Sequence, residues 1–128
     1  MRARISIVVI GVLAALALVA GPAANAARDI HQATLNGSTS YPAVTGKAKF
    51  SRDDGVRQLE AQIEDAKPLA DRRVSFRVNG VTVGTATVNS LGTARIDKAG
   101  RVVPNVTAGS TIRVKRLNGV LVASGRFS

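Results

Sequence analysis

Five basic residues flank two Asn-Gly turns in the second half of the chain, and together they could bind anions. They are Arg73, Arg77, Arg113, Lys115 and Arg116. If the two turns place them on one face, that face is electropositive and attracts nucleic acid, anionic cell-wall polymers or sulfated glycans. Such binding weakens as salt rises, because bound counterions are released. The alternative is that the charge keeps a small secreted domain soluble and protects its edge strands.

Residues for catalysis or metal binding are sparse. His31 is the one histidine and the chain has no cysteine, so a zinc site would lack ligands. We interpret His31 as a solvated residue near the start of the mature chain. Glu60, Glu64 and Asp65 could act as an acid and a base, but Glu60 and Glu64 are expected on the solvent face of one strand. We therefore predict no catalytic residue, no metal site and no cofactor, with an enzyme built on these carboxylates as the alternative.

The first 26 residues have the pattern of a secretory signal peptide. Two arginines precede the apolar run at 5–20, and Ala24-Asn25-Ala26 provides the small residues of a cleavage site. Removing them leaves residues 27–128, where 16 of the 18 basic residues remain against 8 acidic ones. We predict a bacterial protein that is secreted and extracellular, or periplasmic or cell-wall associated, and that contacts the membrane only before cleavage. A retained membrane anchor is the alternative.

The rest of the sequence has the pattern of β-strands. Its apolar residues are mostly small or β-branched, and turn residues recur about every eight to twelve positions. This predicts an all-β fold, an antiparallel immunoglobulin-like β-sandwich of about seven or eight strands. The first strands are expected at 33–36 and 46–51, with a turn at 53–55. Residues 56–66 fit a helix and a strand equally well. We interpret them as a strand, because the turn would pair them with the strand before it.

The stretch RVNGVTVG, residues 77–84, predicts a β-hairpin. Asn-Gly between alternating apolar runs favours a two-residue type I′ turn, since both central residues need positive φ. A turn at Asn79-Gly80 pairs Phe76 with Val83. Beyond Gly84 the alternation shifts, which indicates a bulge or bend at that glycine.

A second copy of the pattern, RLNGVLVA, occupies residues 116–123. It predicts a hairpin at Asn118-Gly119 that pairs Leu117 with Val120. Its apolar residues divide between the two faces of the hairpin. Either the register shifts by one residue or both faces are partly covered, and the sequence leaves both readings open.

One run resembles a known family. LNGSTSYPAVTGKAKFSRDDG, residues 35–55, is similar to the opening of CHRD domains, which have a Leu-x-Gly strand, a Pro and then a Gly-x-Ala strand. NGVTVGTATVNSLGTARI, VPNVTAGSTIRV and NGVLVASGRF resemble small secreted bacterial β domains of unknown function. The resemblance implies an extracellular immunoglobulin-like sandwich without an established activity. CHRD domains carry a His-x-His strand, whereas Val74-Ser75-Phe76 stands here, so a histidine site carried over from that family has no residues to occupy.

These features predict one domain, residues 27–128, that acts as a non-enzymatic secreted structural or interaction module. Its partner is an unidentified protein or an anionic polymer at the cell exterior, and it uses no small-molecule cofactor. The alternative is a polyanion-binding extracellular domain that uses the basic hairpin residues.

Overall fold

The computed structural model describes residues 28–128, and the predicted signal peptide at 1–26 lies outside them. The described residues form one sheet of eight antiparallel strands, ordered β6-β5-β8-β9-β2-β3-β4-β7. No helix in this part of the chain is long and apolar enough to cross a membrane. The predicted all-β antiparallel fold is confirmed. Its strands are β2 (Arg28–Gly37), β3 (Thr45–Asp53), β4 (Val56–Glu64), β5 (Arg73–Val78), β6 (Val81–Thr87), β7 (Ala94–Ala99), β8 (Thr111–Arg116) and β9 (Leu121–Arg126).

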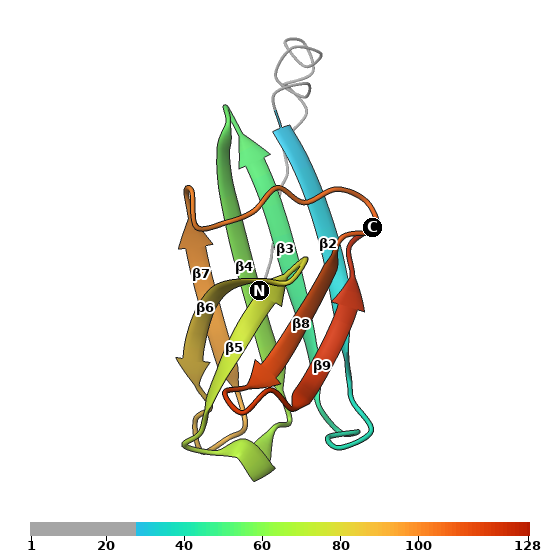
Figure 1. Cartoon of the computed structure of the whole chain (residues 1–128), viewed down its shortest axis with the longest axis vertical. Coiled ribbons are helices and arrows are strands. Elements are labelled where there is room, and N and C mark those ends of the chain that lie inside the picture. The colour runs from blue at the N-terminus through green and yellow to red at the C-terminus, as the bar shows by residue number, and fades with distance from the viewer. Residues whose placement is uncertain (1–27) are drawn as a thin grey trace, which may run out of the picture.

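The sheet folds on itself into two facing layers (Figure 1). We call β6, β5, β8 and β9 the front layer, and β2, β3, β4 and β7 the back layer. Among the described strands, hydrogen bonds join the layers where β9 pairs with β2, at Asn36↔Ser124 and Gly37↔Ala123. On the opposite side β6 and β7 lie near each other as the two edges of the sheet. The stem of Lys98 lies over Gly84 in that seam.

The core fills the space between the layers, as the alternation of side chains requires. On β5, Val74, Phe76 and Val78 are buried while Arg73 is exposed. The back layer contributes apolar side chains to the same cluster. The largest fully buried side chains are Phe50, Phe76, Phe127, Leu35, Leu59, Ile63 and Ile112.

Residues 56–66 contain a strand, which confirms the prediction. β4 runs from Val56 to Glu64 and pairs with β3 on one side and β7 on the other. The preceding turn has positive φ at Asp54 (53°) and Gly55 (81°), as a two-residue hairpin requires. Pairing on both sides outweighs the helical propensity of this segment.

The first strand begins earlier than predicted, and the interpretation of His31 as a solvated residue is wrong. β2 pairs with β3 from Arg28↔Asp53 to Asn36↔Thr45. His31 therefore lies within a paired strand, on the inward-facing side, and its side chain is 16% exposed. Its Nδ1 lies 2.6 Å from the main-chain oxygen of Ser128, within hydrogen-bond distance. The predicted strand at 33–36 was too short, because residues 28–32 also pair with β3, at residues 49–53.

The first Asn-Gly hairpin has the predicted turn but not the predicted register. Asn79 and Gly80 have φ of 49° and 84°, as in a type I′ turn. Phe76 pairs with Gly84 rather than with Val83, and the register shifts next to Phe76. Val83 is the extra residue of a bulge, which turns its side chain into the core, where it is 3% exposed.

The second hairpin has a longer loop than predicted. The N–H of Gly119 donates to the carbonyl of Arg116 at 2.8 Å, and the N–H of Arg116 donates to the carbonyl of Val120 at 2.9 Å. The predicted pairing of Leu117 with Val120 is therefore wrong. The loop holds residues 117–119 and ends on Gly119 with φ of 93°, the usual form of a three-residue hairpin. The sequence left open whether the register shifts or both faces of the hairpin are partly covered. The structure shows a register shift, between Val114 and Lys115.

Both copies of the pattern thus carry a bulge at the same place. In the second copy Val122 is the extra residue, and it is fully buried. Val83 and Val122 are each the seventh residue of their eight-residue copy. The two hairpins also lie side by side, because β5 pairs with β8. The sequence repeat therefore builds the centre of the front layer.

Candidate functional site

The pairing of β5 with β8 brings predicted basic residues together on the outer surface of the front layer. Arg77 lies directly opposite Arg113, and Ser75 lies opposite Lys115. Val74, Phe76 and Val78 on β5, and Ile112 and Val114 on β8, alternate with them and point into the core. Arg73 continues the outward row on β5. We call this surface the basic face and define it by Arg73, Arg77, Arg113, Lys115, Arg116 and Arg126.

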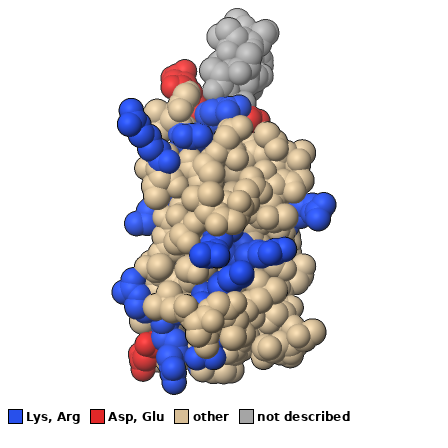
Figure 2. All heavy atoms as spheres, viewed as in Figure 1, with Lys and Arg blue, Asp and Glu red and all other residues tan. Residues whose placement is uncertain are grey.

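Arg116 and Arg126 extend the basic face beyond the central pair. Arg116 ends β8 opposite the buried Val74, on the inward side of the strand, and borders the outer surface only at the turn of the second hairpin. Arg126 lies on β9, two residues after Ser124, which is the partner of the outward Arg113. Every candidate anion-binding residue predicted from the sequence therefore belongs to this one layer. Figure 2 shows Lys and Arg side chains gathered over β5 and β8 in the middle of the front layer.

The basic face contains no compensating acid. The four strands of the front layer include no Asp or Glu. Within residues 28–128, none of the six basic residues forms an ion pair; on the back layer Arg52 pairs with Asp29, and the Nε2 of His31 lies 3.2 Å from the same carboxylate. The outer back layer, in contrast, mixes both signs. The positive excess of the chain is thus concentrated on the front layer.

Three of the arginines, Arg73, Arg77 and Arg116, donate hydrogen bonds to neutral hydroxyl groups. Such partners fix the direction of a guanidinium without cancelling its charge. Each guanidinium has five N–H donors, so most of them stay available to an anion. The three hydrogen bonds join Arg73 Nη2 to Thr85 Oγ1 at 2.5 Å, Arg77 Nε to Thr82 Oγ1 at 3.2 Å, and Arg116 Nη1 to Tyr41 Oη at 3.2 Å.

The basic face also has a shallow depression of about 250 Å³. Ser75 lies within it and is 8% exposed, and its hydroxyl donates to the carbonyl of Lys115 at 3.4 Å. Arg77, Lys115 and the hydroxyls of Thr82 and Thr85 surround it. Two cations and two hydroxyls therefore border the depression, a set of groups that suits one phosphate, sulfate or carboxylate group. Alternation along the first hairpin places Thr82 on the same side as Arg77, but no sequence motif marks these hydroxyls as binding residues.

The central pair works against stability. Like charges directly opposite one another on an antiparallel pair are destabilising, and Arg77 and Arg113 are such a pair. No described carboxylate on these strands offsets the repulsion. Folding alone therefore gives no reason for this arrangement.

The other residues considered for chemistry lie away from the basic face. His31, with its Nε2 3.2 Å from Asp29, belongs to a cluster at one end of β2 and β3. In it Arg52 contacts Asp29 at 2.9 Å and donates to Asn105 at 2.7 Å. These contacts connect β2, β3, the loop at residue 105 and the end of the chain. Within residues 28–128 no group of three His, Cys, Asp or Glu side chains is arranged to hold a metal ion.

The carboxylates considered as an acid and a base are exposed. Glu60 and Glu64 lie on the outer surface of β4, and Glu64 accepts a hydrogen bond from Gln62. Asp65 follows the strand with a positive φ of 61°.

No protein-family model and no curated protein matches the sequence. The resemblance to CHRD domains stays a prediction.

Proposed function

We propose that this protein is a non-enzymatic extracellular interaction module that binds an anionic polymer through the basic face. One observation carries the proposal: six cations lie on a layer without acids, and three of them are oriented by neutral hydroxyls. Repulsion between Arg77 and Arg113 is relieved when an anion lies between them. Secretion, predicted from residues 1–26, would bring this face to polymers outside the cell.

The chemistry of the face favours recognition of charge over recognition of bases or sugar rings. Phe50, Phe76 and Phe127 are buried, and Tyr41 is half-buried and bonded to Arg116. No aromatic side chain is therefore free on the front layer of the described chain to stack on a base. Guanidinium groups match phosphate, sulfate and carboxylate with paired hydrogen bonds. The ligand class is thus a polymer with an anionic group on each unit, such as an anionic wall polymer, a nucleic acid or a sulfated glycan.

Binding of residues 27–128 to dextran sulfate and to neutral dextran, measured across a salt series, tests this function. We expect binding to dextran sulfate and none to dextran. With four to six cations in contact, log K should fall against log salt with a slope of about −3 to −4. Equal binding to both polymers, or binding to dextran sulfate that does not change with salt, would contradict the proposal. A purely structural role would then be the better account.

A further inference from the structure

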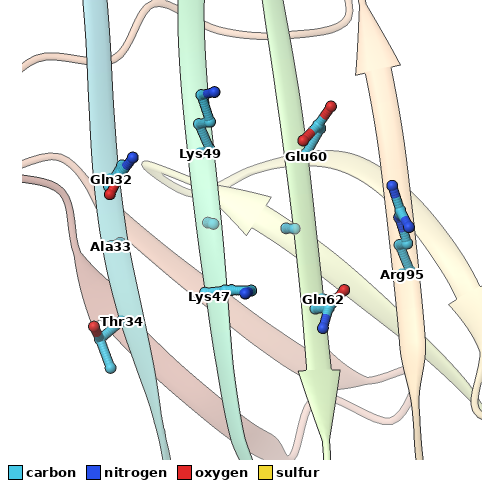
Figure 3. A pocket seen from close by; sticks show the side chains of 10 residues that line it. Gln32, Ala33, Thr34, Lys47, Lys49, Glu60, Gln62 and Arg95 are labelled. Atoms are coloured by element: carbon cyan, nitrogen blue, oxygen red, sulfur yellow. The ribbon is translucent and has the colours of Figure 1, made fainter. Parts of the chain in front are cut away.

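The outer surface of the back layer has a second hollow, of about 530 Å³, on the opposite side of the molecule from the basic face. Two rows of side chains cross the strands and form its walls (Figure 3). One row is Gln32, Lys49 and Glu60, which are aligned across β2, β3 and β4. The other row is Thr34, Lys47, Gln62 and Arg95, which continues to β7. We call the space between the two rows the back groove.

The inward-facing residues beneath the hollow are small. Ala33, Ala48 and Ala61 are aligned across three strands beneath the groove, and all three are buried. The inward rows on either side contain large side chains, with Phe50 and Leu59 in one and Leu35 and Ile63 in the other. The hollow lies over the alanine row, and these three small residues line its floor between the two outer rows.

Several polar side chains in the groove have no partner within the described chain. Lys47, Lys49, Arg95 and Glu60 are exposed and form no hydrogen bond or ion pair with another described residue. Other polar side chains of the same surface are bonded to one another. Gln62 donates to Glu64, and Gln58 donates to Asp97 at 3.1 Å. The groove thus presents three free cations and one free carboxylate.

The back groove differs from the basic face because it contains a carboxylate, that of Glu60, and this difference determines which ligand fits. Glu60 repels a densely charged polymer but accepts hydrogen bonds from hydroxyl groups. Lys47, Lys49 and Arg95 attract an acidic group on the same ligand. With strands about 4.8 Å apart, a groove that crosses four strands is roughly 14 Å long. A ligand of this length needs several hydroxyls and well-separated acidic groups.

We infer that the back groove is a second binding site, and that it takes a short acidic oligosaccharide such as one built from uronic acids. The carboxylates of the sugar lie against Lys47, Lys49 and Arg95, and its hydroxyls donate to Glu60. This site does not depend on the basic face, which lies on the other layer. The protein would then hold a dense polyanion on one side and an acidic, hydroxyl-rich chain on the other.

Titration of a short oligogalacturonate into residues 27–128, with affinity measured from NMR chemical shifts, tests this inference. The deciding result is whether Glu60→Ala raises or lowers the affinity. Glu60→Ala removes a negative charge, so attraction by charge alone would tighten binding. If Glu60 accepts sugar hydroxyls, the same change weakens binding roughly tenfold. The matched control is Asp97→Ala. Asp97 lies directly opposite Glu60 on β7 but does not line the groove.

We expect weaker binding for Glu60→Ala and unchanged or tighter binding for Asp97→Ala. In the unchanged protein, the shifted amides should belong to β2, β3 and β4. Tighter or unchanged binding in both variants would show attraction by charge alone and overturn the inference. So would shifts confined to the front layer, or no binding in the unchanged protein.

Discussion

Reversing the central pair of the basic face, by Arg77→Glu together with Arg113→Glu, is expected to weaken dextran sulfate binding about a hundredfold. The two residues lie opposite one another in the middle of the acid-free layer. An anionic polymer that crosses β5 and β8 contacts both of them, and each charge-assisted hydrogen bond contributes on the order of 1.5 kcal/mol. The reversal also adds repulsion where there was attraction. Equilibrium binding at low salt measures the loss.

A charge-matched variant separates the face from the total charge. Lys67→Glu with Arg101→Glu changes the net charge by the same amount. Both residues are exposed and lie outside the strands of the front layer. We expect this variant to lose less than about tenfold in affinity, because only long-range attraction changes. Equal losses in the two variants would show that total charge, and not the basic face, controls binding.

The single change Arg77→Glu should separate binding from folding. It replaces a like-charged pair with Arg113 by an opposite-charged pair on neighbouring strands. Such a pair is worth about 0.5 kcal/mol, so the free energy of unfolding in urea should rise slightly. Affinity for dextran sulfate should fall in the same protein. A gain in stability together with a loss of binding is expected if the positive charge of Arg77 serves ligand binding and not folding.

The second large effect is expected at Gly125, where β9 approaches β2. A Cβ at this position would lie 2.2 Å from the carbonyl oxygen of Thr34 and 3.0 Å from its carbonyl carbon. Both atoms belong to the backbone, so no rotamer change relieves the clash. The β9–β2 pairing joins the two layers. We therefore expect Gly125→Ala to lower the free energy of unfolding by about 3 kcal/mol or more, as measured by urea denaturation followed by circular dichroism.

Gly55→Ala is the control for this prediction. Gly55 has a positive φ of 81° and no atom within 4 Å of an added Cβ. Alanine there has only the cost of the left-handed conformation, about 1–2 kcal/mol. If Gly125→Ala cost no more than Gly55→Ala, close approach of β9 to β2 would not be a requirement of the fold.

Local patterns predicted the parts of this structure that depend on neighbouring residues. The period of two residues along a strand places Arg73 and Arg77 on one side of β5 and Phe76 on the other, as the structure has them, and Asn79-Gly80 indicated the correct turn. The strand after residue 55 was predicted from the turn that precedes it. These features need only the chemistry of the turn and the period of the strand.

Features that depend on distant strands were beyond the sequence. Nothing local to Arg77 indicates that Arg113 lies opposite it, because that contact needs β5 to pair with β8. The change of alternation indicated a bulge or bend at Gly84, next to the extra residue Val83, and a register shift was one of two readings of the second hairpin, but the alternation alone does not identify the inserted residue. The position of His31 depends on how far β3 extends. The back groove needs three alanines aligned across three strands.

The most direct test of the basic face is the footprint of a short sulfated oligosaccharide on the backbone amides of residues 27–128, measured by NMR. The account predicts that the largest changes in amide chemical shift fall on β5 and β8, with smaller ones on β6 and at Arg126. The amide shifts of β2, β3 and β4 should not change. Changes concentrated on the back layer, or spread evenly over both layers, would contradict the assignment of anion binding to the basic face.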